Sequence, residues 1–345
     1  MSAPFFIAEA GVNHDGSLDK ALRLVDIAAD AGADAIKFQT FRAADIANPA
    51  ARRAEYQQAA LGEGSQFEML RALELDEAAH RLLAERCATR GIEFMSTAFE
   101  PWALDMLIGL GMRRIKVPSG EITNLPLIRA MARAGLPIIL STGMADLAEV
   151  ARAVEWIRQT WAEHGIADGG SDMLTILHCT SNYPTRPEDA NLAAMATMRA
   201  AFGVPVGYSD HTVGSPVCFA AVALGASVIE KHFTENPSDP GPDHAASIDP
   251  AELATLVQEV KAVAASLGNG RKEPRASELP VRALVRRSAY AARSIAAGAP
   301  LTPADVIWQR PAGEIGPEDA DAVFGASAAA DITAGAALSW ALLRR

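Results

Sequence analysis

The chain has 345 residues, half of them apolar, and a formal net charge of −11, so it is long enough for a large domain and a small one. The acidic balance argues against nucleic-acid binding, which depends on neutralising phosphates, and no apolar run is long enough to span a membrane. Three separated cysteines without a CxxC pair argue against a disulfide framework and a thiolate zinc site. The N-terminus lacks the basic region of a signal peptide, and we therefore expect a cytoplasmic protein.

Short apolar runs alternate with longer amphipathic stretches along the first three quarters of the chain. Ser17 and Asp146 are candidate helix N-caps, and Gly32 and Gly165 are candidate helix terminators. Eight such strand-then-helix units match a (β/α)8 barrel in number and length. A doubly wound sheet is the alternative, but it would usually offer fewer units and a glycine-rich phosphate loop, which "EAGVNHDGS" is not. The predicted strands are 5–10, 35–40, 93–98, 114–119, 137–142, 174–180, 205–210 and 227–233.

The pattern changes at "GNGRKEPRASELP", which is typical of a linker. We therefore expect a barrel domain over 1–268, a linker over 269–285 and a small domain over 286–345. The last segment contains the strand-like pieces "SAYAARSI" and "ALSWALL". A piece of this size has little core of its own, so we expect it to dock on the barrel or on a neighbouring subunit.

Polar side chains stand at the ends of all eight predicted strands. In a (β/α)8 barrel, the residues that perform chemistry lie where strands end and the following loops begin. Any one of these residues alone is readily explained as structural, but polar endings on every strand predict an active site. They are Glu9, Asn13, His14, Lys37, Gln39, Ser96, Thr97, Lys116, Ser119, Glu121, Ser141, Thr142, His178, Thr180, Ser181, Asn182, Tyr183, Ser209, Asp210, His211, Glu230, Lys231 and His232.

Two histidines and two lysines narrow the chemistry. His211 and His232 end adjacent strands, which lie ~4.8 Å apart, so both can bind one divalent ion of the Mn, Fe or Co kind. Lys37 and Lys116, with the hydroxyls nearby, form a cradle for a phosphorylated or carboxylated anion. Either lysine alone could instead form a Schiff base, but an enzyme of that kind needs no metal. Cys179 is interpreted as a packed thiol, since this chemistry needs no thiol nucleophile.

Several motifs resemble those of the sialic acid (nonulosonate) synthases. They are "IAEAGVNHDGS", "KFQTF", "STAFE", "KVPSGEITNLPLI", "PIILSTGM", "HCTSNYP", "GYSDHTVG", "EKHFT" and "PGPDH", in order through the barrel. The segment "RRSAYAARSIAAGAPLTPADVIWQRPAGEIGP" is similar to that family's antifreeze-like (SAF) domain. The resemblance implies a TIM barrel followed by a small β-rich SAF domain.

The resemblance also implies an activity. Phosphoenolpyruvate would condense with an open-chain N-acetylated aminosugar, either N-acetylmannosamine or 2,4-diacetamido-2,4,6-trideoxymannose, giving a nine-carbon 2-keto acid and phosphate by C–O cleavage. His211 and His232 would hold a divalent ion, Mn²⁺ first and Mg²⁺ or Co²⁺ as alternatives, which polarises the aldehyde. Arg310 would reach the sugar's N-acetyl group from the partner subunit's tail domain, which implies a domain-swapped homodimer.

The remaining roles follow from the same resemblance. Glu9 would act as a general base or as an electrostatic stabiliser when water attacks C2, and Glu121 would lie near both substrates. Some family members have Asn where this chain has Ser181, so either Ser181 or Asn182 would contact phosphoenolpyruvate. The other contacts to phosphoenolpyruvate would be Lys37, Thr97, Lys116, Ser119, Ser141 and Ser209, and those to the sugar Gln39, Tyr183 and Asp243.

Two other functions stay open at this point. A related phosphoenolpyruvate-dependent aldolase would make a shorter 3-deoxy-2-keto sugar acid from a phosphorylated aldose, but such enzymes lack this tail. A non-catalytic sugar-binding or ice-binding protein would have had no reason to keep polar residues at every strand end.

Overall fold

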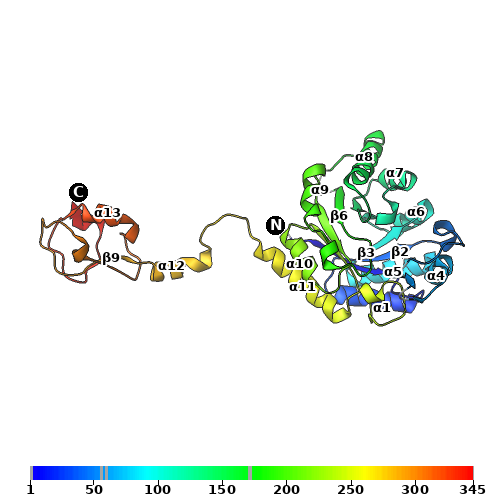
Figure 1. Cartoon of the computed structure of the whole chain (residues 1–345), viewed down its shortest axis with the longest axis horizontal. Helices are drawn as coiled ribbons and strands as arrows, with labels where there is room; N and C mark the ends of the chain where they lie inside the picture. Colours follow the sequence, from blue (N-terminus) through cyan, green and yellow to red (C-terminus); the bar gives the residue numbers. More distant parts are fainter. Residues whose placement is uncertain (1–2, 55–56, 59–60, 170–172, 345) are drawn as a thin grey trace. The chain divides into compact units, whose positions relative to one another are not determined.

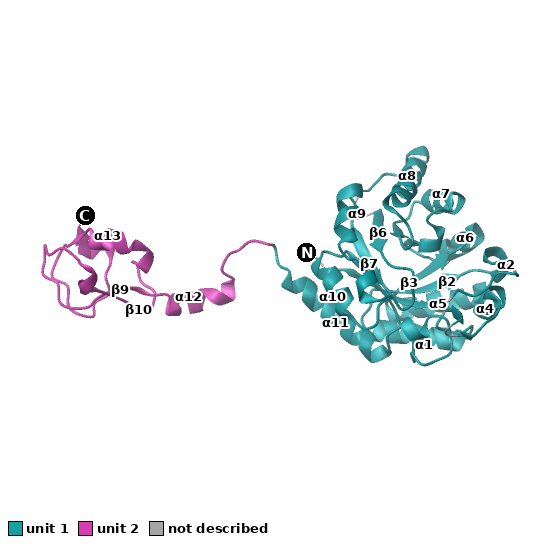
Figure 2. Cartoon of the chain, viewed as in Figure 1, with its two compact units in different colours: residues 1–269 teal, residues 270–345 magenta. Residues whose placement is uncertain are grey.

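The computed structural model describes residues 3–54, 57–58, 61–169 and 173–344. The chain forms two compact units, residues 1–269 and residues 270–345 (Figure 2). Each unit is described by itself. None of the described helices is long and apolar enough to span a lipid bilayer.

The first unit is built on an eight-stranded parallel sheet in the order β3-β2-β1-β8-β7-β6-β5-β4 (Figure 1). Its edge strands β3 and β4 contact each other, so the sheet comes close to a closed barrel. The predicted TIM-like fold is therefore confirmed. The strands are β1 (Phe5–Gly11), β2 (Ala35–Thr40), β3 (Glu93–Ala98), β4 (Ile115–Val117), β5 (Ile138–Ser141), β6 (Leu174–His178), β7 (Val206–Asp210) and β8 (Val228–His232).

Helices follow the strands along the chain, and the predicted caps are confirmed. The side chain of Ser17 accepts a hydrogen bond from the N–H of Lys20, and Asp146 forms a reciprocal capping box with Glu149. Gly32 has a φ of 75° just beyond the first helix, a conformation that favours glycine. The helices are α1 (Leu18–Asp30), α2 (Ala43–Ile46), α4 (Gln66–Ala72), α5 (Glu77–Arg90), α6 (Pro101–Gly109), α7 (Leu125–Arg133), α8 (Leu147–Glu163), α9 (Ala194–Phe202), α10 (Pro216–Ala223) and α11 (Pro250–Ser266).

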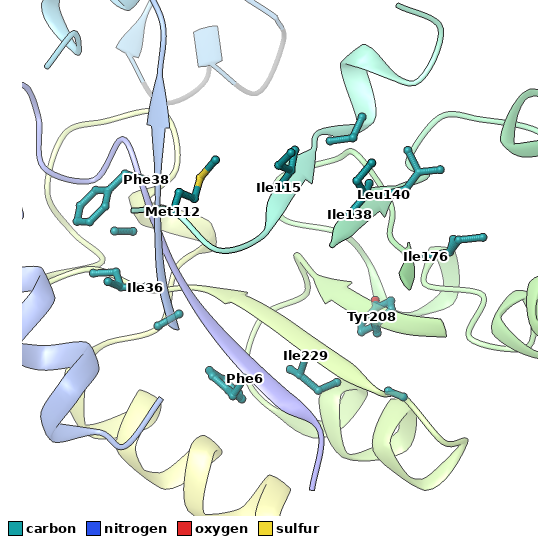
Figure 3. Packing of buried hydrophobic residues seen from close by; sticks show 14 of the residues in the cluster. Phe6, Ile36, Phe38, Met112, Ile115, Ile138, Leu140, Ile176, Tyr208 and Ile229 are labelled. Carbon is teal, nitrogen blue, oxygen red and sulfur yellow. The ribbon is translucent and has the colours of Figure 1, made fainter. Parts of the chain in front are cut away.

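Strand side chains alternate between two apolar environments. One face contributes to the large core shared with the helices, in which Phe6 and Ile229 lie at paired positions on β1 and β8 (Figure 3). The other face forms a separate cluster inside the sheet: Ile7, Ala35, Met95, Ile139, Leu177 and Val228. Because side chains two positions apart share a face of a strand, the residues that follow this inner cluster by two also face inward. They are Glu9, Lys37, Thr97, Ser141, Cys179 and Glu230.

Gly207 shows how tightly this inner layer is packed. A Cβ atom at this position would lie 2.7 Å from Leu177 Cδ2 and 2.9 Å from Val228 Cβ, closer than carbon atoms approach. Because Gly207 has no side chain, β7 fits between Leu177 and Val228, and Ser209, two residues further along the strand, lies above the apolar layer. The polar side chains at the strand ends thus lie directly above this apolar layer.

The second unit has two small antiparallel sheets and a core of its own. Strand β9 (Ser288–Ala291) pairs with β10 (Val306–Gln309), and β11 (Ser327–Ala328) with β12 (Leu343–Arg344). The predicted strand "ALSWALL" is interrupted, because residues 340–342 form a 3₁₀ helix, and its last residue, Leu343, begins β12. Contrary to our expectation, this unit buries a cluster of ten apolar residues: Ala289, Ala291, Ile295, Leu301, Val306, Ile315, Val323, Ala328, Ile332 and Leu338.

Two further features of this unit were not visible in the sequence. The segment expected as a linker contains α12 (Leu279–Val285), and the carbonyl of Ala283 accepts a hydrogen bond from the N–H of Ala312. Asp305 accepts hydrogen bonds from Thr302 and from Arg293, which hold its pKa down at about 2. The carboxylate therefore fixes the turn between β9 and β10 in its ionised form.

Candidate active site

A cavity of about 580 Å³ opens at the carboxyl ends of the strands. Its lining includes the predicted site residues except Glu121, Asn182 and Arg310: Glu9, Lys37, Gln39, Thr97, Lys116, Ser119, Ser141, Ser181, Tyr183, Ser209, His211, His232 and Asp243. A larger cavity of about 870 Å³ lies elsewhere on the same unit, beside Arg42, Arg71 and Trp102, and none of the predicted residues lines it. Size alone would therefore have selected the wrong cavity.

Two carboxylates and two ammonium groups form a buried network at the centre of the cavity. Lys37 Nζ lies 2.6 Å from Glu9 Oε2 and 3.7 Å from Glu230 Oε2, and Lys116 Nζ lies 3.0 Å from Glu230 Oε1. Ser209 donates a hydrogen bond to Glu230 Oε1 at 2.9 Å. The strand registers explain the grouping, since Glu9 is paired with Lys37 across β1 and β2, and Ser209 with Glu230 across β7 and β8.

Burial and the mutual charges move the pKa values within this network. Burial raises the pKa of Glu9 to about 7, although Lys37 opposes the shift. Burial also acts to raise the pKa of Glu230, but Lys116 and Lys37 outweigh it and hold that pKa below its usual range. Burial lowers the pKa of Lys116, whereas Glu230 and Glu9 keep the pKa of Lys37 above its ordinary value. Of the two carboxyl groups in this network, Glu9 is thus the one able to exchange a proton near neutral pH.

His211 and His232 lie side by side, with ring centroids 5.4 Å apart. His211 Nδ1 lies 2.7 Å from the carbonyl of Thr180, which as acceptor fixes the N–H on Nδ1, so that Nε2 keeps its lone pair and lies 3.4 Å from Ser209 Oγ. His232 Nδ1 is buried and has no hydrogen-bond partner among the residues that the structure describes. Burial lowers the pKa of both rings, that of His211 to about 4, so both are neutral imidazoles. A buried neutral pair in which His232 Nδ1 has no hydrogen-bond partner among the described residues fits a divalent metal ion.

The close approach of β1, the end of β8 and the loop that follows β8 at Gly11 was missed in the sequence. A Cβ atom there would lie 3.4 Å from Glu9 Oε1, 3.5 Å from His232 Cε1 and 3.6 Å from Asp243 Oδ2, and the φ of Gly11 is 53°. Asp243 is buried, which raises its pKa to about 6. Glycine therefore leaves open the space onto which the carboxyl groups and the imidazole converge.

Hydroxyl groups line the side of the cavity formed by β4, β5 and β6. Ser119 Oγ accepts a hydrogen bond from the N–H of Gly143 at 3.0 Å and lies 3.2 Å from Cys179 Sγ. Ser141 Oγ is buried without a hydrogen-bond partner among the described residues, as a ligand-binding hydroxyl would be. Ser181 lines the cavity, whereas Asn182 is exposed and does not.

The other two cysteines lie away from this cavity. Cys87 packs behind the sheet, and burial raises its pKa to about 12. Cys218 donates to Asp210 at 3.1 Å, and burial holds its pKa well above the usual range. Cys179 is therefore the cysteine that borders this cavity.

Glu121 is not among the described lining residues of the cavity, and Arg310 belongs to the second unit. Glu121 is half-buried in a 3₁₀ helix after β4, and its carboxylate accepts a hydrogen bond from Asn124 Nδ2 at 2.6 Å. Arg310 is exposed on the second unit, just after β10. Asp210 and Lys231 face away from the cavity and form a fully buried ion pair of 2.7 Å.

A second group of metal-type side chains lies nearby. Asp15, Asp239 and His244 bring one ligand atom each within 4.8 Å of the others. Lys20 Nζ already lies 2.7 Å from each aspartate, and His244 Nε2 lies 3.0 Å from Asp15. The ammonium group of Lys20 thus supplies positive charge there, and the cluster joins the 236–247 loop to the start of α1.

Family models match nearly the whole chain: the NeuB family over residues 24–272 and the SAF domain over residues 286–344. The chain belongs to the NeuB family. The resemblance to the sialic acid (nonulosonate) synthases with a C-terminal SAF domain is thereby confirmed.

Individual relatives agree with this family. The NeuB-family chain is 48% identical to the N,N'-diacetyllegionaminic acid synthase of Legionella pneumophila, over 97% of this chain and 93% of the relative. It is 42% identical to the enzyme of the same name from Campylobacter jejuni, over 91% and 92%. The solved N-acetylneuraminic acid synthetase of Leptospira borgpetersenii, in complex with citrate, is 37% identical with a TM-score of 0.70, over 81% of this chain and 90% of that one.

Proposed function

We propose that this NeuB-family chain condenses phosphoenolpyruvate with the open-chain form of an N-acetylated aminosugar, giving a nine-carbon 2-keto acid and phosphate. One observation carries the proposal: buried Lys37 and Lys116 share a cavity with the neutral pair His211 and His232. Cationic groups suit the phosphate and carboxylate of phosphoenolpyruvate, and an imidazole pair suits a metal beside an aldehyde. The synthase relatives support the same reaction.

The bond changes balance with water as the only further reactant. C3 of phosphoenolpyruvate forms a bond to the aldehyde carbon, whose oxygen takes up a proton. Water adds to C2 and loses a proton, and the C2–O bond to phosphate then breaks as the C2 hydroxyl becomes a carbonyl. Glu9 is suited to hold or accept the proton of that water, since its pKa of about 7 leaves both forms populated near neutral pH.

The proposed substrate contacts divide between two sides of the cavity. Lys37 and Lys116 stabilise the negative charge of the departing phosphate. We assign Thr97, Ser119, Ser141, Ser181 and Ser209 to phosphoenolpyruvate, and Gln39, Tyr183 and Asp243 to the sugar. Glu121 is assigned a place near both substrates, although it is not part of the described lining.

A divalent ion completes this proposal. His211 and His232 would hold it, and such an ion supplies Lewis-acid polarisation of a carbonyl group. We propose Mn²⁺ first, with Mg²⁺ and Co²⁺ as alternatives. Two observations support this assignment: His232 Nδ1 is buried without a described hydrogen-bond partner, and the carbonyl of Thr180 fixes the orientation of the His211 ring.

The tail domain is proposed to contribute Arg310 to the sugar site of a second subunit in a domain-swapped homodimer. Mixing Arg310→Ala chains with Lys37→Ala chains tests this idea, because only a mixed dimer contains one site with both residues intact. Recovery of phosphate release in mixed dimers is expected. No recovery in mixed dimers whose formation is verified by mass would contradict the swap.

A phosphate-release assay tests the reaction itself. N-acetylmannosamine, 2,4-diacetamido-2,4,6-trideoxymannose and a phosphorylated aldose are each supplied with phosphoenolpyruvate and Mn²⁺. Release with the N-acetylated sugars supports the proposal, release with the phosphorylated aldose alone supports the shorter-chain aldolase, and no release supports a binding protein. With ¹⁸O in the bridging position, the label should leave in phosphate. Label kept in the keto acid, under conditions where its carbonyl does not exchange, would refute C–O cleavage.

A further inference from the structure

One side of the cavity is apolar and has no part in the roles proposed so far. We define the apolar wall as Val12, Met69, Leu70, Leu73 and Phe99, all of which line the cavity. Val12, Met69 and Leu73 are 4%, 6% and 8% exposed and form a buried cluster separate from the barrel core, with Leu70 and Phe99 packed against it. The wall is thus a packed surface that faces the substrate space.

Contacts behind the apolar wall hold it in place. Phe99 meets Phe41 edge to face, with ring centroids 5.9 Å apart. A Cβ atom at Gly16 would collide with the carbonyl of Ala72, so the end of α4 packs directly on the loop after β1. The side chain of Glu74 accepts a hydrogen bond from the N–H of Ala43 at 2.6 Å. The wall is therefore formed before any substrate binds.

The position of the apolar wall relative to the histidine pair decides which part of an acceptor meets it. His211 follows β7 and His232 is the last residue of β8, and the sheet continues in the order β8, β1, β2, β3. Val12 follows β1, Phe99 follows β3, and α4 lies between β2 and β3 in the sequence. We therefore place an aldose with its aldehyde carbon at the histidine pair and its last carbons over β1 and β2, on the side of Gln39 and toward this wall.

The side chains at this end of the cavity disfavour an aldose whose last carbon carries a polar group. Among the described lining residues on α4 and the segment before it, the polar side chains are the neutral amides of Gln57 and Gln66. Gln57 already accepts a hydrogen bond from the N–H of Ala54 at 2.9 Å. A hydroxyl group placed against Met69 and Leu73 would lose its water without gaining a partner from either of these side chains, and a phosphate group would also bring a charge that the neutral amides of Gln57 and Gln66 do not balance. A methyl group would bury apolar surface instead.

We propose that the apolar wall selects acceptors that end in a methyl group, that is, 6-deoxy N-acetylated aldoses, against their 6-hydroxy and 6-phosphate counterparts. This inference rests on the proposed function and adds to it the residues that set acceptor choice. Met69 and Leu70, both on α4, are the side chains through which the selection acts most directly.

Two sugars that differ only at C6 provide the test: N-acetylmannosamine and its 6-deoxy analogue. With phosphoenolpyruvate and Mn²⁺ saturating, kcat/KM for phosphate release is expected to be about 10- to 100-fold higher for the 6-deoxy sugar, the range that a small apolar pocket achieves. Met69→Gln and Leu70→Asn keep side-chain size while adding a polar group. Each should reduce this preference at least about fivefold through KM for the 6-deoxy sugar, with KM for phosphoenolpyruvate unchanged.

A matched control is Leu224→Asn, at a side chain that is 51% exposed and outside the cavity lining. It should leave the preference unchanged. A wild-type preference near one or in favour of the 6-hydroxyl would overturn the inference alone, as would an unchanged preference in a folded Met69→Gln or Leu70→Asn variant. Leu70 is half-buried, so its variant remains informative if Met69→Gln does not fold. No phosphate release with these two sugars or with 2,4-diacetamido-2,4,6-trideoxymannose, despite calorimetric binding of phosphoenolpyruvate, would overturn the proposed function and this inference together.

Discussion

Replacing Lys231 by Met removes a buried positive charge while keeping the length of the side chain. Lys231 Nζ lies 2.7 Å from Asp210 Oδ2, and both side chains are 0% exposed. Asp210 also accepts hydrogen bonds from the N–H and hydroxyl of Thr212 and from Cys218, so these contacts hold its side chain in this place. The variant leaves that carboxylate buried without a cation. Breaking a buried pair in this way costs about 3–5 kcal/mol of unfolding free energy.

Urea unfolding, followed by tryptophan fluorescence and extrapolated linearly to water, measures this cost. Arg81→Met is the matched control, because Arg81 and Glu77 form an ion pair whose side chains are 56% and 62% exposed. Such a helical surface pair contributes only about 0.3–0.5 kcal/mol. Adding Asp210→Asn to Lys231→Met should recover most of the loss, since no stranded charge remains. A loss below about 1 kcal/mol for Lys231→Met would refute the reasoning.

Three further predictions concern the metal, the thiol beside the cavity and the tail. His211→Ala and His232→Ala should each lower kcat/KM more than about 100-fold, with the free energy of unfolding nearly unchanged. Treatment with EDTA should abolish activity, and added Mn²⁺ should restore it. Full turnover in the chelated protein would exclude the metal role. Iodoacetamide should label Cys179 before the other two cysteines, and bound phosphoenolpyruvate should slow that labelling. Peptide mass spectrometry measures both rates. A labelling rate of Cys179 that phosphoenolpyruvate does not change would place the substrate elsewhere. Because the pKa of Asp305 falls from 3.8 to about 2 on folding, its stabilising effect is complete above about pH 4 and disappears as the pH falls to about 2. Hydrogen exchange of tail peptides should therefore differ between the wild type and Asp305→Asn at pH 5 and converge near pH 2, and a difference that persists at pH 2 would contradict this.

Local sequence determined the strands and the candidate site to a large extent. Strand existence follows from short apolar runs, and helix starts follow from the side chains of Ser17 and Asp146, which act within one turn. Because the strands of a barrel end on one face, polar strand ends predicted that Lys37 and His232 share a cavity. They do.

Tertiary structure decided what the strand ends do. Glu230, Lys231 and His232 are consecutive polar residues, and the sequence treats them alike, but the pleat turns Lys231 outward and the register pairs it with Asp210. The pKa of Glu9 depends on burial and on charges from other strands, which no local pattern contains.

The apolar wall was also beyond the reach of the sequence. Met69 and Leu73 belong to the segment between β2 and α5, where apolar residues have no strand-end signal and no fixed partner. Only packing of that segment on the loop after β1 brings them to the cavity. Sequence alone therefore determined which strands form and which reactive groups end them, because these depend on neighbours along the chain. The fold decided which side chains face the substrate, how they ionise and what covers them, because these depend on residues distant in the sequence.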